Sequence, residues 1–561
     1  MKYQFDNKSL VEISKDFSSL PTTVSLTGEG LDVKQLVAVA RKKTIVALTS
    51  DPKILNRIKT THQHMISDIK KGVPVYGCNT GYGARASRVL NNGSEEQRID
   101  QARQISEGII HTDVTVGPPL DASVTRGAMV IRINNLMKGV SGVKIQDLEI
   151  LRQMLNAQIT PIVGQYGGIG ASGDLAHNCR VLSAARQIPG TKVWDKEGTV
   201  REAKEALLKE KIAPLILDPK AGLGMVNGDN FSTSLAALLL ADTIDTLLIA
   251  LVTGAMVVEV LKGTDRSFHP LLAAMRPHAG QKEVADIYRF LLNGSKLAYQ
   301  EMAGHKPRGK DVKVQDAYSL RGISQYHGLN VEKLKSYLEM VTINFNSVSD
   351  NPLWVPDELT TANEKPWQWV SGGNFLAMYM VEVMDGIRKT LTQIVKLNDR
   401  HLARLVNPNE NNGLLANLSD DKAMTHCAFK GVQIQSGMFE VYSSLLSVPV
   451  STFFGVHEEG NQDITAHSLT SGIFALENLR IARYSLAQNL LAVCQGVDLC
   501  GGAELLSPKT RPIYELIRKN SAYVEVERPL AFEIEKIYDM MVQGEIVKLI
   551  NSVVFSGYEQ K

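Results

Sequence analysis

The spacing of hydrophobic residues changes near residue 230. Before this point, short runs of β-branched residues, such as 44–48 and 73–76, stand between turns rich in glycine and aspartate, which is typical of short strands. Beyond it, apolar residues recur at helical spacing over long stretches. Four stretches predict long helices: 232–261, 387–405, 473–497 and 532–553.

These patterns predict a mainly α fold, with a mixed N-terminal domain followed by a large elongated helical bundle. Helices of this length pack side by side as near-parallel rods. A length of 561 residues suggests about four domains, but no linker or repeat divides the chain. We therefore expect residues 1–230 to form the mixed N-terminal domain, and residues 231–561 to form the long-helix bundle with C-terminal helices.

The composition narrows the classes of function. Lys and Arg number 61 and Asp and Glu 59, a formal charge of +2. This balance predicts neither a nucleic-acid partner nor binding to an anionic membrane. The five cysteines form no CxxC pair, and the N-terminus has no apolar signal segment, so we expect a cytoplasmic protein. His62 and His64 lack further ligands nearby in the sequence, so we predict no metal site.

A glycine-rich loop allows a first hypothesis. Residues 168–173 match the dinucleotide fingerprint GxGxxG, between a candidate strand at 159–163 and a candidate helix at 175–187. A second candidate strand at 191–195 ends in an acidic residue, as in a nucleotide-binding unit. An NAD-dependent oxidoreductase is therefore one alternative, although helices rather than further strand–helix units follow.

A second hypothesis starts from the tripeptide Ala171-Ser172-Gly173 inside the same loop. Glycine has no Cβ, so its nitrogen can bend back onto a nearby carbonyl. If the nitrogen of Gly173 attacks the carbonyl of Ala171, a five-membered ring closes. Loss of water from the ring and loss of the Ser172 hydroxyl leave an exocyclic methylidene. The product is an electrophile that the chain makes from itself.

The chain resembles the histidine/phenylalanine/tyrosine ammonia-lyase and aminomutase family over most of its length. These enzymes carry a methylideneimidazolone (MIO) group built from Ala-Ser-Gly. The segments that support the resemblance are GGIGASGDLA at 167–176, VYGCNTGYG at 75–83, GLGMVNG at 222–228, VQDAYSLR at 314–321, SVSDNPL at 347–353, SGGNF at 371–375 and NQD at 461–463.

The resemblance implies an MIO cofactor from Ala171, Ser172 and Gly173, with no metal and no nucleotide. It also implies a homotetramer of helical rods whose active sites are assembled from several subunits. The activity would be non-oxidative elimination of ammonia from an aromatic L-amino acid, giving an aryl-acrylate. A tyrosine/phenylalanine 2,3-aminomutase, which returns the ammonia to the β-carbon, and a histidine ammonia-lyase are the alternatives within the family.

The resemblance also implies roles for single residues. Tyr76 and Tyr318 would be catalytic, with Tyr76 as the base for the β-proton, and a tyrosine acts so only if its pKa is lowered. Arg321 would grip the substrate carboxylate. The remaining substrate-binding positions are His111, Thr112, Asn227, Gln315, Asn351, Phe375, Asn461 and Gln462.

Three positions bear on the substrate, for which we favour tyrosine, followed by phenylalanine, with histidine last. His111 and Thr112 stand where the family recognises the substrate ring, and a histidine there can pair with a phenol hydroxyl. Gln462 stands where histidine-specific members have a glutamate.

Some positions depart from the family pattern. His177, Asn178 and Cys179 follow Ala176 where proline is usual. Asp229 and Asn230 replace a threonine and a glutamine, and Leu376 replaces a histidine.

Overall fold

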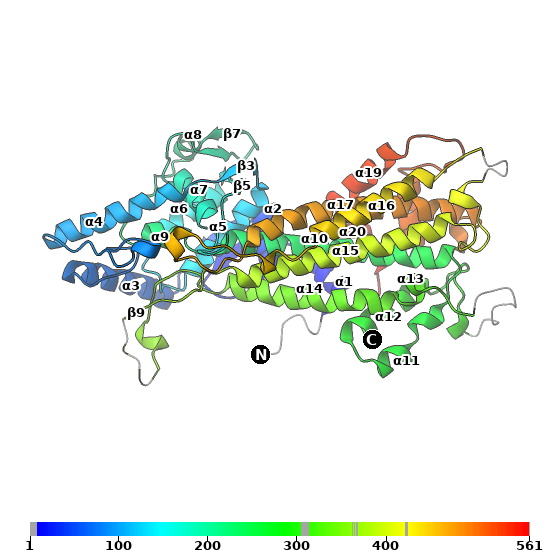
Figure 1. Cartoon of the computed structure of the whole chain (residues 1–561), viewed down its shortest axis with the longest axis horizontal. Coiled ribbons are helices and arrows are strands. Elements are labelled where there is room, and N and C mark those ends of the chain that lie inside the picture. The colour runs from blue at the N-terminus through cyan, green and yellow to red at the C-terminus, as the bar shows by residue number, and fades with distance from the viewer. Residues whose placement is uncertain are drawn as a thin grey trace.

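The structure is a computed structural model that describes residues 8–303, 314–361, 363, 365, 368–420 and 425–559. The molecule is elongated, with short helices and small sheets at one end and long, nearly parallel helices along the rest (Figure 1). This arrangement confirms the mainly α fold with an elongated bundle. The division into two domains at residue 230 stays a prediction. One hydrophobic core contains residues from both parts of the chain.

The N-terminal part is built from short elements. Its helices are α1 (Leu10–Ser18), α2 (Val33–Arg41), α3 (Pro52–Lys71), α4 (Glu95–Gly108), α5 (Ala122–Leu136), α6 (Ile145–Asn156), α7 (Leu175–Ala185), α8 (Ala203–Lys209) and α9 (Ala221–Val226). Its strands are β1 (Thr23–Leu26), β2 (Ile45–Leu48), β3 (Val116–Pro119), β4 (Thr160–Pro161), β5 (Gly164–Tyr166), β6 (Lys192–Trp194) and β7 (Val200–Glu202).

The sheets of this part are too small and differently paired for a dinucleotide-binding fold. β1 and β2 are parallel, with Thr23 opposite Ile45, whereas β3 pairs with β5 and β4–β6–β7 form a three-stranded sheet, all antiparallel. The two candidate strands of the nucleotide-binding hypothesis correspond to β4 and β6, which are antiparallel neighbours. A dinucleotide-binding unit needs them parallel, so the NAD-dependent alternative is wrong.

Helices of very different lengths form the rest of the molecule. They are α10 (Asn230–Val260), α11 (Pro270–Met275), α12 (Ala279–Leu292), α13 (Tyr318–Arg321), α14 (Ile323–Phe345), α15 (Met378–Val406), α16 (Lys430–Leu446), α17 (Ser468–Leu499), α18 (Arg511–Arg518), α19 (Ala531–Val542) and α20 (Glu545–Leu549), with the short hairpin β8 (Leu353–Trp354) and β9 (Trp369–Val370) between α14 and α15.

Helix α10 is the centre of the bundle. It contacts α5, α14, α15 and α17, and nearly all of its residues are buried, so its apolar character all round matches its surroundings. In the described part of the chain it alone is long and apolar enough to cross a membrane, and 89% of its most apolar window is buried inside the protein.

Three of the four long helices expected from the sequence are confirmed as α10, α15 and α17. The fourth prediction, one helix over 532–553, is wrong. Gly544 adopts a left-handed conformation with φ of +78°, which ends α19 and begins α20, and a π-helical turn (Ile550–Val554) follows.

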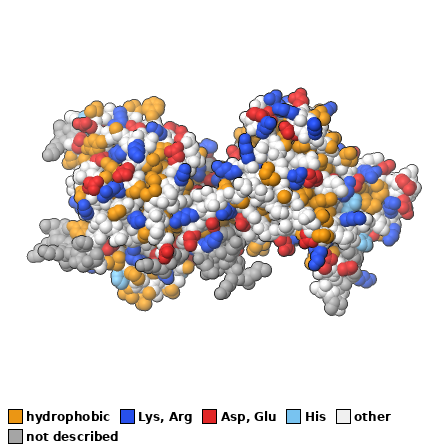
Figure 2. All heavy atoms as spheres, turned by 180° about the vertical axis from the view of Figure 1, so that it is seen from behind, with side chains coloured by type: hydrophobic (Ala, Val, Ile, Leu, Met, Phe, Trp, Pro, Cys, Tyr) orange, Lys and Arg blue, Asp and Glu red, His pale blue; other side chains and the backbone are white. Residues whose placement is uncertain are grey.

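The charges on the visible surface are mixed (Figure 2), as the balanced composition predicts, and the cysteines are unpaired. Seen from behind, positive and negative side chains are scattered without a broad field of one sign (Figure 2). All five cysteines lie in the described residues, and each is free.

Candidate active site

Four helices begin around the turn that contains Ala171, Ser172 and Gly173. Helix α7 starts directly after it, and the Asp174 N–H donates to the carbonyl of Gly228, just before α10, at 2.8 Å. The N–H of Ala377, before α15, donates to the carbonyl of Gly170 at 3.2 Å. The N–H of His467, before α17, donates to the carbonyl of Ile169 at 2.9 Å. Each helix N-terminus has a partial positive charge, so the turn lies in a positive field.

The turn is closed so tightly that only small residues fit. Gly170 and Gly173 have φ values of +72° and +66°, a region that favours glycine. A Cβ on Gly173 would overlap the carbonyl group of Gly228, with which Gly173 forms a parallel β-bridge. Ala171 is 4% exposed, while Ser172 is only half-buried. The serine side chain is therefore the accessible group of the tripeptide.

Hydrogen bonds that start at the Asp174 side chain connect the first turns of α7, α10 and α17. Its carboxylate accepts hydrogen bonds from the N–H of Ser232 at 2.6 Å and from the Ser232 hydroxyl at 2.7 Å. The same hydroxyl lies 2.7 Å from the hydroxyl of Ser468 in α17. Burial raises the pKa of Asp174 to about 7, and the charge of Asp229 adds to this, while the bonds from Ser232 oppose it.

A buried ion pair supports the other wall of the site. The Nζ of Lys220 donates to Asp350 at 2.5 Å, and both side chains are completely buried. The Asn227 side chain donates to the other carboxylate oxygen of Asp350 at 3.2 Å and lies 3.4 Å from the carbonyl of Asn351. The Asn351 side chain in turn accepts from the N–H of Gly372 at 2.8 Å. Two predicted residues, Asn227 and Asn351, therefore lie together here.

Two loops far apart in the chain meet beside Ser172. The Gln462 side chain donates to the Ser172 hydroxyl oxygen at 3.1 Å. The hydroxyl of Tyr76 accepts from the N–H of Gly83 at 2.9 Å, and the carboxylate of Glu458 occupies the space where Gly83 lacks a Cβ. The structure thus brings the loop that contains Tyr76 against the loop that contains Gln462. Burial raises the pKa of Tyr76, and the charge of Glu458 raises it further, while the Gly83 N–H opposes both.

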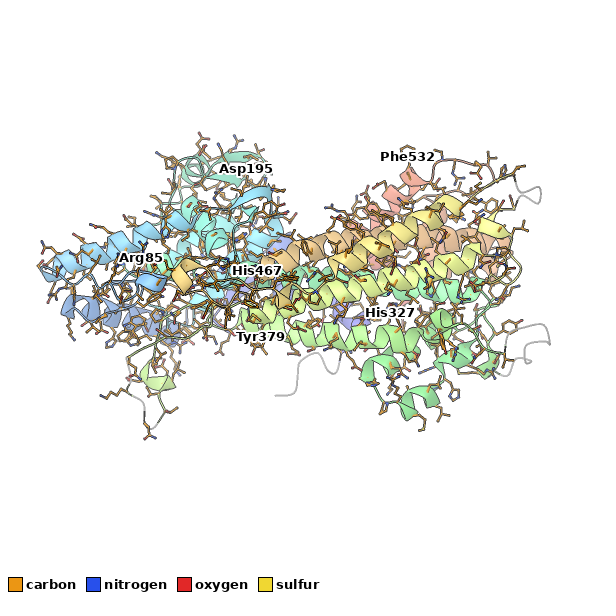
Figure 3. The ribbon with its side chains drawn as sticks, viewed as in Figure 1. Arg85, Asp195, His327, Tyr379, His467 and Phe532 are labelled. Atoms are coloured by element: carbon orange, nitrogen blue, oxygen red, sulfur yellow. The ribbon has the colours of Figure 1, made fainter. Side chains whose placement is uncertain are left out.

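Two further contacts lie on these loops. Asn461 is exposed and donates to Glu458 at 2.8 Å. Arg85 pairs with Glu459 at 3.1 Å. Figure 3 shows Arg85 and His467 on the N-terminal half of the molecule, whereas His327 lies far along the bundle.

The predicted ring-recognition pair sits in the 3₁₀ turn Ile109–Thr112, which packs on α7. His111 is exposed, and its Nδ1 lies 2.7 Å from the carbonyl of Gly108. The Thr112 hydroxyl donates to the carbonyl of Ile109 at 2.9 Å. The Cys179 thiol also lies 3.5 Å from that carbonyl, and burial raises its pKa to about 11.

His177 is a buried neutral histidine. Burial lowers its pKa to about 4, although a contact with the carbonyl of Gln165 opposes this. Its ring lies 5.6 Å from the ring of Phe231 and would touch a side chain on Gly168. Phe375 is half-buried, two residues before the Ala377 that bonds to the turn.

Three predicted residues lie far from the turn within one chain. Tyr318 and Arg321 form α13, where the guanidinium stacks over the tyrosine ring at 4.4 Å, and Gln315 is exposed just before it. The His401 ring N–H donates to the carbonyl of Ser319 at 2.7 Å. At about 1.5 Å per residue, α15 extends about 35 Å from its start beside the turn to His401. Figure 1 accordingly shows α7 and α13 toward opposite ends of the molecule.

No group of three or more His, Cys, Asp or Glu side chains within the described ranges is arranged to hold a metal ion.

Comparison with known proteins identifies the class. A sequence profile for the aromatic amino acid lyases matches residues 31–519. The chain is 34% identical over 505 residues to phenylalanine ammonia-lyase 1 of Pleurotus ostreatus, covering 85% of this chain and 65% of the fungal protein. It is 29% identical over 534 residues to the histidine ammonia-lyase of Alkaliphilus oremlandii, covering 95% and 99%. The solved structure of tyrosine aminomutase from Streptomyces globisporus superposes with a TM-score of 0.85 and 27% identity, covering 96% and 100%.

A helical carbon–nitrogen lyase is the class that these likenesses and the fold define. The chain belongs to the aromatic amino acid lyase family. Its relatives include phenylalanine and histidine ammonia-lyases and tyrosine aminomutases, so the family alone does not select the substrate.

Several residues that support the site were missed from the sequence. Lys220, Asp350, Asp174 and Ser232 bond within or beside the site. Asp174 and Asp350 stand inside recognised segments, which was a usable signal. Lys220 has no such signal, because its neighbours in the sequence do not distinguish it from a surface lysine.

The buried pair predicts a measurable loss of stability. Lys220→Met leaves the Asp350 carboxylate buried without its cation, so we expect unfolding free energy to fall by about 3–5 kcal/mol. Urea unfolding measures this. The double variant Lys220→Met/Asp350→Leu removes both charges and should recover part of the loss. A single variant as stable as the natural chain would contradict the assigned pairing.

Proposed function

We propose that this enzyme eliminates ammonia from an aromatic L-amino acid, with tyrosine favoured and phenylalanine next, through an MIO group formed from Ala171, Ser172 and Gly173. The observation that supports this best is the turn itself: three small residues, closed against Gly228, at the meeting point of four helix N-termini.

The residues of the turn fit such a group. Ring closure requires close backbone approach between residues 171 and 173, and the left-handed Gly173 conformation with no space for a Cβ is suited to it. Ser172 points its hydroxyl toward a polar amide, Gln462. When present, the group supplies an electrophile that converts the amine of the substrate into a better leaving group.

Tyr76 is the side chain that would take the β-proton. Its hydroxyl is held by the Gly83 N–H, on the loop that meets the 457–462 loop beside Ser172. Its pKa is raised in the single chain, so the phenolate is scarce at neutral pH. A cationic side chain placed near it would stabilise the phenolate.

Arg321, which would grip the substrate carboxylate, reaches the turn only if it comes from another copy of the chain. The stacked Tyr318–Arg321 pair is about 35 Å from the turn of its own chain, Tyr318 is 80% exposed, and the Arg321 Nε has no hydrogen-bond partner in the described structure. In a homotetramer with shared active sites, the Tyr318–Arg321 pair of one copy would lie at the turn of another copy.

Helix α16 presents a surface suited to such an assembly. Ile434, Met438, Val441 and Leu445 are exposed by 67%, 55%, 58% and 67% and follow one another at helical spacing. A continuous exposed apolar stripe on a helix of a bundle is typical of a surface that another protein covers.

We propose that the assembled enzyme is cytoplasmic.

His111 supports tyrosine as the substrate. A carbonyl oxygen only accepts hydrogen bonds, so in the neutral ring Nδ1 donates to Gly108. Nε2 then keeps its lone pair and can accept a hydrogen bond from a phenol hydroxyl. The amide of Gln462 offers no negative charge to an imidazole ring, which disfavours histidine. A tyrosine 2,3-aminomutase is the second candidate, because the similarity to the Streptomyces globisporus aminomutase spans nearly the whole chain.

The first test concerns the electrophile. Peptide mass spectrometry across residues 171–173 should show a deficit of two waters in the natural chain and none in Ser172→Ala. The variant should remain folded and lose turnover of tyrosine. Unmodified Ala-Ser-Gly in soluble, folded natural enzyme would contradict the proposal. Analysis of the product distinguishes an aryl-acrylate, which the lyase forms, from a β-amino acid, which the aminomutase forms.

The second test concerns the base. Tyr76→Phe should lower kcat on the order of a hundredfold or more, whereas Tyr82→Phe, which alters a tyrosine of the same loop that bonds to the Ile105 carbonyl, should change it little. Because the Tyr76 pKa is raised and the base must be ionised, kcat should rise with pH, by about tenfold per unit below that pKa. An unchanged rise in Tyr76→Phe would exclude this role.

The third test concerns specificity. His111→Phe removes the acceptor for a phenol hydroxyl, so kcat/KM for tyrosine should fall about tenfold relative to that for phenylalanine. Steady-state kinetics on tyrosine, phenylalanine and histidine measure the shift. An unchanged preference, or turnover of histidine alone, would refute the assigned recognition.

A further inference from the structure

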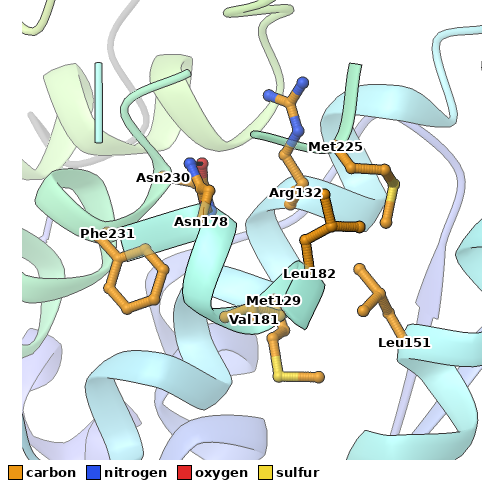
Figure 4. Close-up of a pocket in the computed structure, with 9 residues that line it drawn as sticks. All are labelled: Met129, Arg132, Leu151, Asn178, Val181, Leu182, Met225, Asn230 and Phe231. Carbon is orange, nitrogen blue, oxygen red and sulfur yellow. Dashed lines mark hydrogen bonds between the residues drawn. The ribbon is translucent and has the colours of Figure 1, made fainter. Parts of the chain in front are cut away.

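Two asparagines form a reciprocal pair beneath the Ala-Ser-Gly turn. Asn178 lies one turn into α7 and Asn230 is the first residue of α10. The Nδ2 of Asn178 lies 2.8 Å from the Oδ1 of Asn230, and the Nδ2 of Asn230 lies 2.7 Å from the Oδ1 of Asn178. The two side chains are 3% and 1% exposed. Figure 4 shows them close together, with apolar side chains and Arg132 nearby. The cavity that these residues line has a volume of only about 10 Å³.

Each amide also binds the backbone of a neighbouring segment. The Asn178 amide nitrogen lies 3.0 Å from the carbonyl of Val226 and 3.1 Å from that of Gly228. The Asn230 amide donates to the carbonyl of Ala128, in α5, at 3.0 Å. The pair therefore ties α7 and α10 to α5 and to the segment before α10.

Gly228 is the part of this network that touches the turn. Its carbonyl accepts from the Asp174 N–H at 2.8 Å and fills the space that a Cβ on Gly173 would need. On its other side, a Cβ on Gly228 would meet the side chains of Ser349 and Arg132. Arg132 is itself fixed, because its Nε donates to the Gly224 carbonyl at 2.9 Å. The Asn178 amide completes the set of groups that fix the Gly228 carbonyl.

We propose that Asn178 and Asn230 act as one unit of positioning residues, which hold the Gly228 carbonyl against Gly173 and so keep the turn in the conformation that closes the ring. This role rests on the proposed function. Asn230 stands where this chain departs from the family pattern, and it bonds reciprocally to Asn178. An apolar residue at either position would leave the other amide buried with unpaired groups.

The experiment measures ring closure rather than turnover alone. Asn178→Ala, Asn230→Ala and the double variant are expressed in parallel, and the fraction of chain that lacks two waters at residues 171–173 is determined over time by peptide mass spectrometry. We expect ring closure to be about tenfold slower in each single variant. The double variant should be no slower than either single one, because the two act as a unit.

Kinetics provide a second readout. Incomplete ring formation removes active sites, so kcat should fall in proportion to the modified fraction, while KM for the substrate stays unchanged. The matched control is Asn489→Ala, which removes a buried amide in α17 that donates to the Asn398 carbonyl at 3.0 Å, remote from the turn. It should lower thermal stability and leave ring closure complete.

The outcomes separate the two proposals. If the natural chain shows no loss of two waters, the proposed function fails. If the natural chain is modified and folded Asn178→Ala is modified equally fast, only the positioning role fails. If the alanine variants do not fold, Asn230→Asp keeps the volume but cannot donate to Asn178 or Ala128. It should still slow ring closure, and normal closure there would overturn the inference.

Discussion

The convergence of four helix N-termini on one turn is the constraint on which this structure depends. The first turns of helices leave backbone N–H groups without partners inside the helix. Here the carbonyls of Gly228, Gly170 and Ile169 and the Asp174 carboxylate accept N–H groups at or beside the beginnings of α7, α10, α15 and α17. The helices therefore have fixed starting points, and the partial positive charges of their N-termini surround the turn.

The length of α15 separates the predicted site residues into two groups. Ser172, Tyr76, Gln462, Asn227 and Asn351 lie near its beginning, whereas Tyr318, Arg321 and Gln315 lie near its end. A rigid helix of about 35 Å keeps these groups apart. Complementary groups at opposite ends of one rod, together with the apolar stripe of α16, favour an assembly in which copies of the chain complete one another.

The sequence predicted the long helices because apolar residues at helical spacing indicate which face of a helix is buried. It failed at Gly544, where one left-handed residue breaks a continuous pattern. It also failed at 73–76, where no strand forms because the N–H of Val75 bonds to the Asn79 side chain at 2.7 Å instead of to a neighbouring strand. The turn was recognisable from its residues. Pairings such as Lys220 with Asp350 were not, since their partners are remote in the sequence and only folding brings them together.

The contacts of the turn also determine when it can take shape during synthesis. Its shape relies on bonds to Ala377 and His467 and on the side chain of Gln462, all encoded long after Ser172. A chain still emerging from the ribosome lacks these partners and cannot hold the turn closed. A reactive group of the kind proposed for the turn would then form only after the surrounding protein is present to shield it.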